Sequence, residues 1–336
     1  MSHSNIALFI PHRGCPHQCS FCNQHQITGR QHQPRGEDVI HAVETALAKG
    51  RPDPDHTEIA FFGGSFTAVE RSYQTELLSA AAPYVRQGVV RGIRISTRPD
   101  AVDGEILQFL KGYGVTAIEL GAQSMQDEVL RINGRGHTAA QVEQAARLIR
   151  EMGFSLGLQM MTGLPVDTAD GAKETAKKLA ALQPDTMRIY PTIVMAGTDL
   201  AAWYQAGDYT PMELEEAVAL CSELLDFFEE QGIKVIRLGL HDTEELAQNR
   251  LAGPYHPAFA ELCHSRRFLQ KLTVCLEKQS VSKGDLQVAV HPRCLSQSIG
   301  QGKRNLAALE QLGYRCKFYG DPAVFPQAFR IEKKER

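Results

Sequence analysis

Residues 6–22 read IALFIPHRGCPHQCSFC, an apolar run typical of a buried strand that leads directly into a loop with three cysteines. Cys15, Cys19 and Cys22 have the spacing C-x3-C-x2-C. Three thiolates in one short loop can bind three irons of a four-iron cluster and leave the fourth iron without a protein ligand, whereas closed ferredoxin-type clusters use four cysteines. The spacing therefore predicts a [4Fe-4S] cluster with one open iron that can bind a substrate or cofactor.

A zinc site is the alternative interpretation of this loop. Structural zinc takes four ligands, and candidates for the fourth lie nearby in the sequence at His12, His17 and His25. The chain carries eight cysteines, and its first residues lack the basic-then-apolar pattern of a signal peptide. We therefore expect a cytoplasmic protein with reduced thiols, which suits metal or cluster chemistry.

Size and composition are those of a globular protein with a large core. The chain has 336 residues, of which 43% are hydrophobic. Its apolar runs are all much shorter than the roughly 18 residues that a membrane-spanning helix needs. One large domain or two, and no membrane span, are expected.

Strand-like and helical segments alternate along the first two thirds of the chain. Strands are expected at 6–10, 58–62, 92–96, 115–120, 156–160 and 187–190, and helices between them at 37–49, 71–82, 103–111, 138–152 and 169–181. Six βα units in a row predict an α/β fold with a parallel sheet, either open or closed into a barrel. We expect a partial (β/α)6 TIM-like barrel. A helix at 211–231 and a strand at 234–238 follow.

Polar residues and glycines follow each of the predicted strands. In parallel α/β folds the chemistry lies at the carboxyl ends of the strands. The cysteine loop follows the first strand, and the later strands end in 63–65, 96–100, 119–124, 159–165 and 190–192. These residues are therefore expected to meet on one rim of the barrel.

Charge is distributed unevenly along the chain. Residues 1–36 hold three Lys or Arg and no Asp or Glu, residues 37–263 hold 19 basic and 33 acidic residues, and residues 264–336 hold 14 basic and six acidic residues. A basic tail following an acidic core indicates a polyanionic partner such as RNA, although chance clustering on a solvated surface gives the same pattern. We expect a core over residues 1–240 and a small basic α+β domain over residues 241–336.

Several of these motifs together resemble a known family. The cysteine spacing, the glycine pair at 63–64 and the turn at 163–165 resemble the radical S-adenosylmethionine (SAM) enzymes. Residues 96–100, 119–124, 135–138 and 189–192 are similar to the radical SAM core of the catalytic subunit of Elongator, which modifies the wobble uridine of tRNA. This narrower resemblance covers about residues 5–240.

The resemblance implies the roles of individual residues. Cys15, Cys19 and Cys22 would ligate the cluster, and SAM would bind the open iron and be cleaved to methionine and a 5′-deoxyadenosyl radical. Matching positions imply SAM contacts from Phe21, Gly63, Gly64, Ser65, Ser96, Gln123, Arg135 and Gln159. Each also has a structural alternative, such as a tight turn for the glycines, core packing for Phe21 or a helix cap for Gln123.

The chain departs from the family pattern in two places. Ser96 stands where the family often has a glutamate that binds the ribose hydroxyls. The Elongator subunit has an acetyltransferase domain after its radical core, whereas the roughly 100 residues after this core show no recognisable phosphate loop for an acyl-CoA. An acyl donor is therefore not implied.

The tail carries a second resemblance. Its expected order is helix 258–270, strand 272–277, strand 286–291, helix 293–299, basic turn 300–304, helix 305–312 and strand 314–319. This order resembles a prokaryotic-type KH domain, in which a G-x-x-G loop between two helices meets the nucleic-acid backbone. Lys303 replaces the second glycine, and with Arg304 it is expected to contact RNA. A small α/β domain that covers the barrel is the alternative.

The favoured function is radical modification of RNA, in particular tRNA, with a reductant such as flavodoxin or ferredoxin as electron donor. Tyr190 is a candidate for gating or relaying the radical, or a core tyrosine. One alternative is oxidation of a small molecule, as in oxygen-independent coproporphyrinogen oxidases, although the segment 9–14 lacks their His-Ile-Pro-Phe. Another is an RNA-binding protein whose cluster senses iron or oxygen without turnover.

Overall fold

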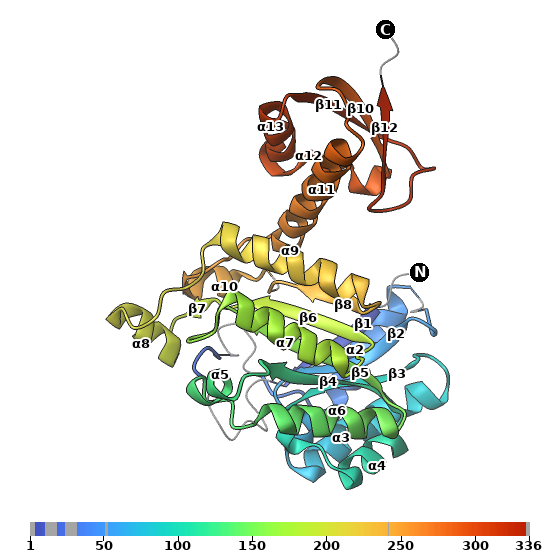
Figure 1. Ribbon diagram of the computed structural model, residues 1–336. Coiled ribbons are helices and arrows are strands. Elements are labelled where there is room, and N and C mark those ends of the chain that lie inside the picture. The colour runs from blue at the N-terminus through green and yellow to red at the C-terminus, as the bar shows by residue number, and fades with distance from the viewer. Residues whose placement is uncertain (1–3, 11–18, 24–31, 51–52, 241, 334–336) are drawn as a thin grey trace. The chain divides into compact units, whose positions relative to one another are not determined.

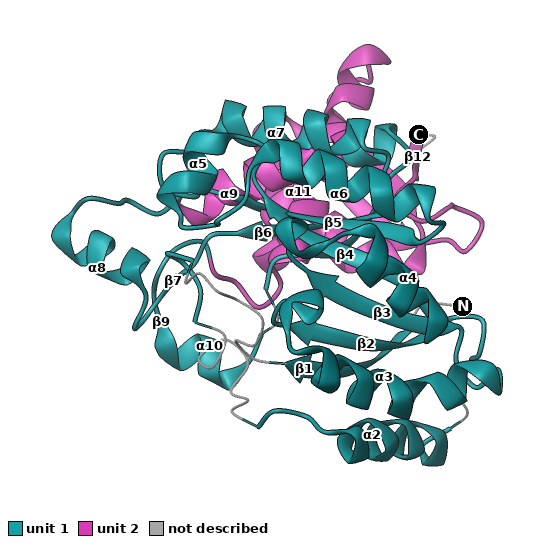
Figure 2. Cartoon of the chain, turned by 90° about the horizontal axis from the view of Figure 1, so that it is seen from below, with its two compact units in different colours: residues 1–212, 228–254 teal, residues 213–227, 255–336 magenta. Residues whose placement is uncertain are grey.

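The computed structural model describes residues 4–10, 19–23, 32–50, 53–240 and 242–333 (Figure 1). The chain divides into two compact units, shown in separate colours in Figure 2. Unit 1 holds residues 1–212 and 228–254, and unit 2 holds residues 213–227 and 255–336. The domain boundary after residue 240 stays a prediction.

Unit 1 is built on one parallel sheet of seven strands in the order β1-β2-β3-β4-β5-β6-β8. The strands are β1 Ser4–Ile10, β2 Thr57–Gly63, β3 Gly92–Thr97, β4 Val115–Gln123, β5 Ser155–Thr162, β6 Thr186–Pro191 and β8 Lys234–Leu238. All six predicted strands are confirmed, and the predicted strand at 234–238 joins them as the seventh. The central strands β2, β3, β4 and β5 are nearly continuously buried, as is typical of strands in a parallel sheet.

Helices connect the strands and cover the outer face of the sheet (Figures 1 and 2). They are α2 Gly36–Ala48, α3 Arg71–Arg86, α4 Gly104–Gly112, α5 Asp127–Ile132, α6 Ala139–Glu151 and α7 Ala169–Ala181, with short 3-10 turns η1 Phe66–Ala68 and η2 Pro99–Ala101. Asp103, Thr138 and Thr168 cap α4, α6 and α7 by accepting hydrogen bonds from first-turn amides. These cap residues determine where the three helices begin, because their side chains accept hydrogen bonds from backbone N–H groups that have no partner within the helix.

The sheet is curled. The Arg188 guanidinium on β6 lies 5.0 Å from the ring centre of Phe62 on β2. Three strands separate β2 from β6, so in a flat sheet these strands would be about 19 Å apart. Only a concave sheet brings the two side chains together, and the predicted partial barrel is therefore confirmed.

Buried ion pairs line the concave face and link strands β2, β3, β4 and β6. Arg94 Nε donates to Glu58 Oε2 at 2.7 Å, and Arg94 Nη1 donates to Glu119 Oε1 at 3.1 Å. Arg188 Nη2 donates to the same Glu119 oxygen at 2.9 Å. Two carboxylates and two guanidinium groups alternate across the sheet, so each charge has a partner of opposite sign.

Unit 1 also contains smaller elements beyond the sheet. They are β7 Val194–Met195, α8 Asp199–Ala206, α10 Glu244–Asn249 and β9 Arg250–Ala252. Strands β7 and β9 pair antiparallel. The sequence did not predict these four short elements, because each is shorter than the periodic patterns that identify helices and strands.

Unit 2 combines most of α9 Leu214–Glu230 with the C-terminal part of the chain. Its elements are α11 Phe259–Lys278, β10 Gly284–Val290, η3 Pro292–Cys294, α12 Leu295–Ile299, η4 Gln301–Lys303, α13 Arg304–Gln311, β11 Tyr314–Gly320 and β12 Phe329–Lys333. The sheet order is β11-β10-β12, with β10 parallel to β11 and antiparallel to β12. The predicted small α+β domain is present.

One predicted element of the tail is wrong. Residues 272–277 were expected to form a strand, but they continue α11, whereas the third strand is β12, which the sequence did not indicate. Leu272 and Leu276 are four residues apart and fully buried, so they lie on one helical face. The tail therefore has the order helix, strand, helix, helix, strand, strand, and the KH-like assignment stays a prediction.

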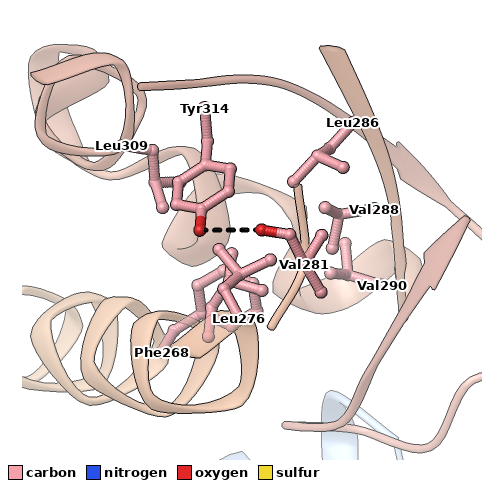
Figure 3. Close-up of a cluster of buried hydrophobic side chains, with 9 residues drawn as sticks. Phe268, Leu276, Val281, Leu286, Val288, Val290, Leu309 and Tyr314 are labelled. Carbon is pink, nitrogen blue, oxygen red and sulfur yellow. Dashed lines mark hydrogen bonds between the residues drawn. The ribbon is translucent and has the colours of Figure 1, made fainter. Parts of the chain in front are cut away.

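A separate hydrophobic core holds unit 2 together (Figure 3). Phe268, Leu272 and Leu276 of α11 pack against β10 and α13, and the Tyr314 hydroxyl donates to the Val281 carbonyl at 3.2 Å. A buried polar group costs little when it is hydrogen-bonded, so this tyrosine fits an apolar core. No helix among the described residues is long and apolar enough to cross a membrane.

Replacing Glu119 with alanine is expected to destabilise the protein by about 3–5 kcal/mol, because Arg94 and Arg188 then lose the carboxylate they share. Urea unfolding followed by circular dichroism measures the change in the free energy of unfolding. The control is Glu143→Ala on the exposed face of α6. Equal stabilities of the two variants would contradict a structural role of the buried ion pairs.

Candidate active site

The carboxyl end of β2 is a glycine because the backbone of β1 lies against it. Gly63 has φ +102°, and a Cβ atom on it would lie 3.1 Å from the carbonyl oxygen of Ile10. A side chain there would be both strained and crowded. Gly64, half-buried, and Ser65, buried, continue the chain along the rim.

The Ser65 hydroxyl joins two neighbouring strand ends. It lies 2.9 Å from Thr97 Oγ1 and accepts a hydrogen bond from the Arg98 backbone N–H at 3.2 Å. The predicted SAM contact of Ser65 stays a prediction, since its hydroxyl already holds the β2 and β3 loops together. Ser96, next to this junction, is half-buried and in register with Glu119.

Two predicted site residues meet at the carboxyl ends of β4 and β5. Gln123 is buried and has φ +66°, at a bulge where the register of β4 against β5 shifts. Gln159 Nε2 donates to Gln123 Oε1 at 3.2 Å. The bulge is the local reason for this pairing, because bulges re-aim side chains at strand ends.

Arg135 brings the cysteine segment to this part of the rim. Its Nη1 donates to Cys19 Sγ at 3.0 Å, and its Nη2 donates to the Gly121 carbonyl at 2.7 Å. Its Nε is buried and has no hydrogen-bond partner among the described residues. A buried donor without an acceptor is costly, so this atom indicates a ligand at the site.

Gly121 makes room for that arrangement. A Cβ atom at this position would lie 3.1 Å from Gln123 Nε2 and 3.4 Å from Arg135 Nη2. Gln123 and Arg135 thus approach each other over Gly121. The sequence analysis located this glycine at a strand end but did not predict it as a site residue.

A further set of contacts fixes the segments that carry Cys19 and Arg135. The Ser20 hydroxyl donates to Asn133 Oδ1 at 2.7 Å, and the Ser20 N–H donates to the Asn133 carbonyl at 3.2 Å. Arg98 Nη2 donates to the Arg135 carbonyl at 2.9 Å. Sequence reasoning missed Asn133, which is fully buried, because an isolated asparagine in a turn carries no motif.

The cysteine segment itself is only partly described. The Cys22 N–H donates to the Cys19 carbonyl at 3.0 Å, so a tight turn brings these two cysteines together. Cys15 and the candidate zinc ligands His12, His17 and His25 lie outside the described residues. Among the residues that the structure describes, no three His, Cys, Asp or Glu side chains form a metal-binding group.

Phe21 and Tyr190 pack against a shared hydrophobic cluster. Both are partly buried against Val129, Met161 and Leu164. The Tyr190 hydroxyl also accepts a hydrogen bond from Arg188 Nη1 at 3.4 Å. Their predicted roles toward adenine and the radical stay predictions, but both lie near the strand ends that carry Gln123 and Gln159.

His137 is a buried neutral histidine beside this site. Its Nε2 lies 3.2 Å from the Ala122 carbonyl, which can only accept, so the ring proton is on Nε2. Nδ1 is buried and has no partner among the described residues. Burial lowers the pKa of His137 to about 4, and the nearby charge of Arg135 lowers it as well.

The residues predicted to contact RNA belong to unit 2 and are far in the sequence from the other predicted site residues. Lys303 and Arg304 are exposed at the start of α13, and Arg304 Nη1 pairs with Glu215 Oε1 at 2.6 Å. Lys303 has φ +63°, and no side chain caps α13. The structure thus leaves the basic turn accessible.

A curled parallel sheet with a cysteine segment and polar strand ends on one rim defines a barrel enzyme of the kind that binds its cofactor there. The model of the radical SAM superfamily matches residues 9–179, half of the chain, and the model of the Radical_SAM C-terminal domain matches residues 184–268. The chain belongs to the radical SAM superfamily.

Individual relatives agree with this assignment. The chain is 28% identical over 243 residues to a tRNA uridine(34) acetyltransferase of Dehalococcoides mccartyi, covering 61% of this chain and 52% of that protein. It is 31% identical over 202 residues to human Elongator complex protein 3, covering 53% of this chain and 37% of that protein. The chain thus spans about half or less of the length of these two curated relatives.

A solved structure shows the same fold. The archaeal Elp3 of Methanocaldococcus infernus, with residues 1–46 deleted, superimposes with a TM-score of 0.64 at 21% identity. The match covers 84% of this chain and 64% of that one. The predicted family and fold are therefore confirmed.

The buried His137 gives the stability of the cluster-free protein a defined pH dependence. Its folded pKa of about 4 lies below the ordinary histidine value of 6.5, so between these two pH values the unfolded chain binds a proton that the folded protein does not. Stability should be fully present above pH 6.5 and fall by up to about 3 kcal/mol as pH drops to 4.

Urea unfolding between pH 7 and pH 4 measures this loss, and His137→Gln should remove it. The control is His41→Gln at an exposed position of α2, which should keep the wild-type slope. The same slope in the His137 variant and in wild type would show that this histidine is not held neutral.

Proposed function

We propose that this protein is a radical SAM enzyme that modifies RNA, with tRNA as its substrate. The observation that carries the proposal is the position of Arg135, which donates to the Cys19 thiol and to a strand-end carbonyl and leaves its buried Nε without a partner. A guanidinium group at a cysteine of the cluster motif suits an anionic cluster and a carboxylate-bearing cofactor.

The residues present fit a [4Fe-4S] cluster with bound SAM. Cys15, Cys19 and Cys22 would hold three irons, and the cluster with SAM would supply a 5′-deoxyadenosyl radical that abstracts a hydrogen atom from the substrate. Arg135 Nε would donate to the methionyl carboxylate, and the paired amides of Gln123 and Gln159 would offer hydrogen bonds to the nucleoside part.

The other predicted contacts would shape the site. Gly63 and Gly64 would let the backbone approach the methionyl amine, while Ser65 and Ser96 lie at the neighbouring strand ends. Phe21 would lie against the adenine and help to exclude water from the radical. An external reductant such as flavodoxin or ferredoxin would deliver the electron.

Two observations support an RNA substrate. Relatives named tRNA uridine(34) acetyltransferase and Elongator complex protein 3 match the core of this chain. The tail is strongly basic, with 14 Lys or Arg and six Asp or Glu in residues 264–336. Positive charge of this kind attracts nucleic-acid backbones, so we assign RNA binding to the tail and chemistry to the core.

Anaerobic incubation of the reconstituted protein with SAM, dithionite and total tRNA is expected to yield 5′-deoxyadenosine and an altered tRNA nucleoside. Chromatography with mass spectrometry measures both products. Cys19→Ala should abolish both, because it removes a cluster ligand, whereas Cys316→Ala, on a half-buried position of β11, should leave both unchanged.

The outcomes of this experiment separate the alternatives. Production of 5′-deoxyadenosine with an unchanged nucleoside profile would keep the radical chemistry and refute the tRNA substrate. If no 5′-deoxyadenosine forms although the cluster is intact, the protein is a cluster-containing sensor and the enzymatic proposal fails.

Replacing Lys303 and Arg304 with glutamate should weaken tRNA binding by about tenfold at 150 mM salt and flatten its salt dependence, because phosphate contacts dominate such affinities. Fluorescence anisotropy with labelled tRNA measures both quantities. Arg86→Glu with Arg147→Glu on exposed helix faces of unit 1 makes the same change in net charge. Equal affinities for both double variants would refute the tail as the RNA contact.

A further inference from the structure

Among the described residues, one guanidinium group on the concave face of the sheet takes no part in the ion pairs there. Glu58 and Glu119 balance Arg94 and Arg188 in the ion pairs described above. Arg237, on β8, lies beside Arg188 in register. Because neighbouring residues of paired parallel strands point to the same face, the two guanidinium groups share the concave side.

Arg237 has no counter-ion among the residues that the structure describes. Its Nε donates to the Gly239 carbonyl at 2.9 Å, and its two Nη groups have neither a hydrogen bond nor an ion pair with any described residue. The segments 11–18 and 24–31, which the structure does not describe, contain no Asp or Glu at all. The cysteine loop therefore offers no carboxylate that could neutralise this guanidinium.

The two neighbouring arginines differ in their electrostatic environment. Burial alone lowers the pKa of Arg188, but Glu119 raises it overall. For Arg237, burial lowers the pKa and Arg188 lowers it further, while Tyr190 has the opposite effect. A half-buried guanidinium next to a second one favours the binding of an anion.

Tyr190 completes a site with the geometry for an anion. Its hydroxyl oxygen accepts a hydrogen bond from Arg188 Nη1 at 3.4 Å, which leaves its proton free to be donated. The planar fork of Nη groups on Arg237 matches the oxygens of a phosphate or carboxylate. One hydroxyl donor and one unpaired guanidinium thus lie together at the β6–β8 edge.

We propose that Arg237 and Tyr190 bind an anionic group of the substrate, namely the phosphate adjoining the base that the radical attacks. The choice of a nucleotide phosphate rests on the proposed function, whereas the anion site itself rests only on the unpaired guanidinium. Phosphate binding at this edge would orient the nucleotide across the concave face toward Gln123 at the end of β4 and toward Arg135.

Isothermal titration of the cluster-reconstituted protein with uridine 5′-monophosphate, uridine, malonate and SAM tests the site. Wild type should bind the monophosphate about tenfold or more tightly than uridine, and Arg237→Gln should abolish this difference. Arg237→Lys, which keeps the charge but loses the fork, should retain only part of it. Arg147→Gln, on an exposed position of α6, is the matched control and should behave as wild type.

The other ligands decide between sources of the anion. If malonate binding, and not monophosphate binding, depends on Arg237, the anion site stands and the substrate is a small carboxylic acid rather than RNA. If tRNA proves unmodified while monophosphate binding still depends on Arg237, the site stands although the proposed function fails.

Two results would overturn the proposal. One is a change of less than about twofold in the affinity for both anions in Arg237→Gln. The other is a loss of about tenfold in SAM affinity in this variant, since Arg237 would then bind the cofactor carboxylate and not the substrate.

Discussion

The ion pairs across the concave face are the constraint on which the rest of unit 1 depends. Glu119 accepts hydrogen bonds from arginines on β3 and β6, so it ties strands that are not neighbours in the sheet. Its side chain reaches Arg188 across the intervening strand β5. Because all seven strands are parallel, their carboxyl ends lie along one rim, where the cysteine segment and the polar residues meet. Charged groups on a buried concave face are costly when they have no partner. An unpaired charge on this face therefore indicates where a ligand binds.

Arg135 connects this scaffold to the cluster motif. It contacts Cys19 on one side and the carbonyl of Gly121 on the other, while Arg98 holds its backbone from the end of β3. Arg135 thus connects the ends of β3 and β4 to the loop after β1. Such support keeps a site precise, because a ligand positioned by rigid strands moves less than one on a free loop.

The sequence predicted the architecture of unit 1 well and that of the tail less well. Strands of the core are continuous apolar runs, and capped helices separate them, so local signals agree with the fold. The strand prediction for residues 272–277 failed because these six residues lie on α11, and over so short a stretch the apolar pattern of a buried helix face fits a strand as well as a helix. Strand β12 was missed for a related reason, since pairing with β10, and not its own pattern, makes it a strand.

By itself the sequence determined the family and the cysteine motif, because spacing within a short loop is a local property that needs no fold to be recognised. It also placed most site residues at strand ends, which is a property of parallel sheets in general. Only the tertiary structure decided that Arg135 reaches Cys19, that the Ser65 hydroxyl accepts a hydrogen bond from the loop after β3 and that Arg237 has no counter-ion within the described part of the chain. These facts depend on distances between residues far apart in the chain, and the curl of the sheet sets those distances.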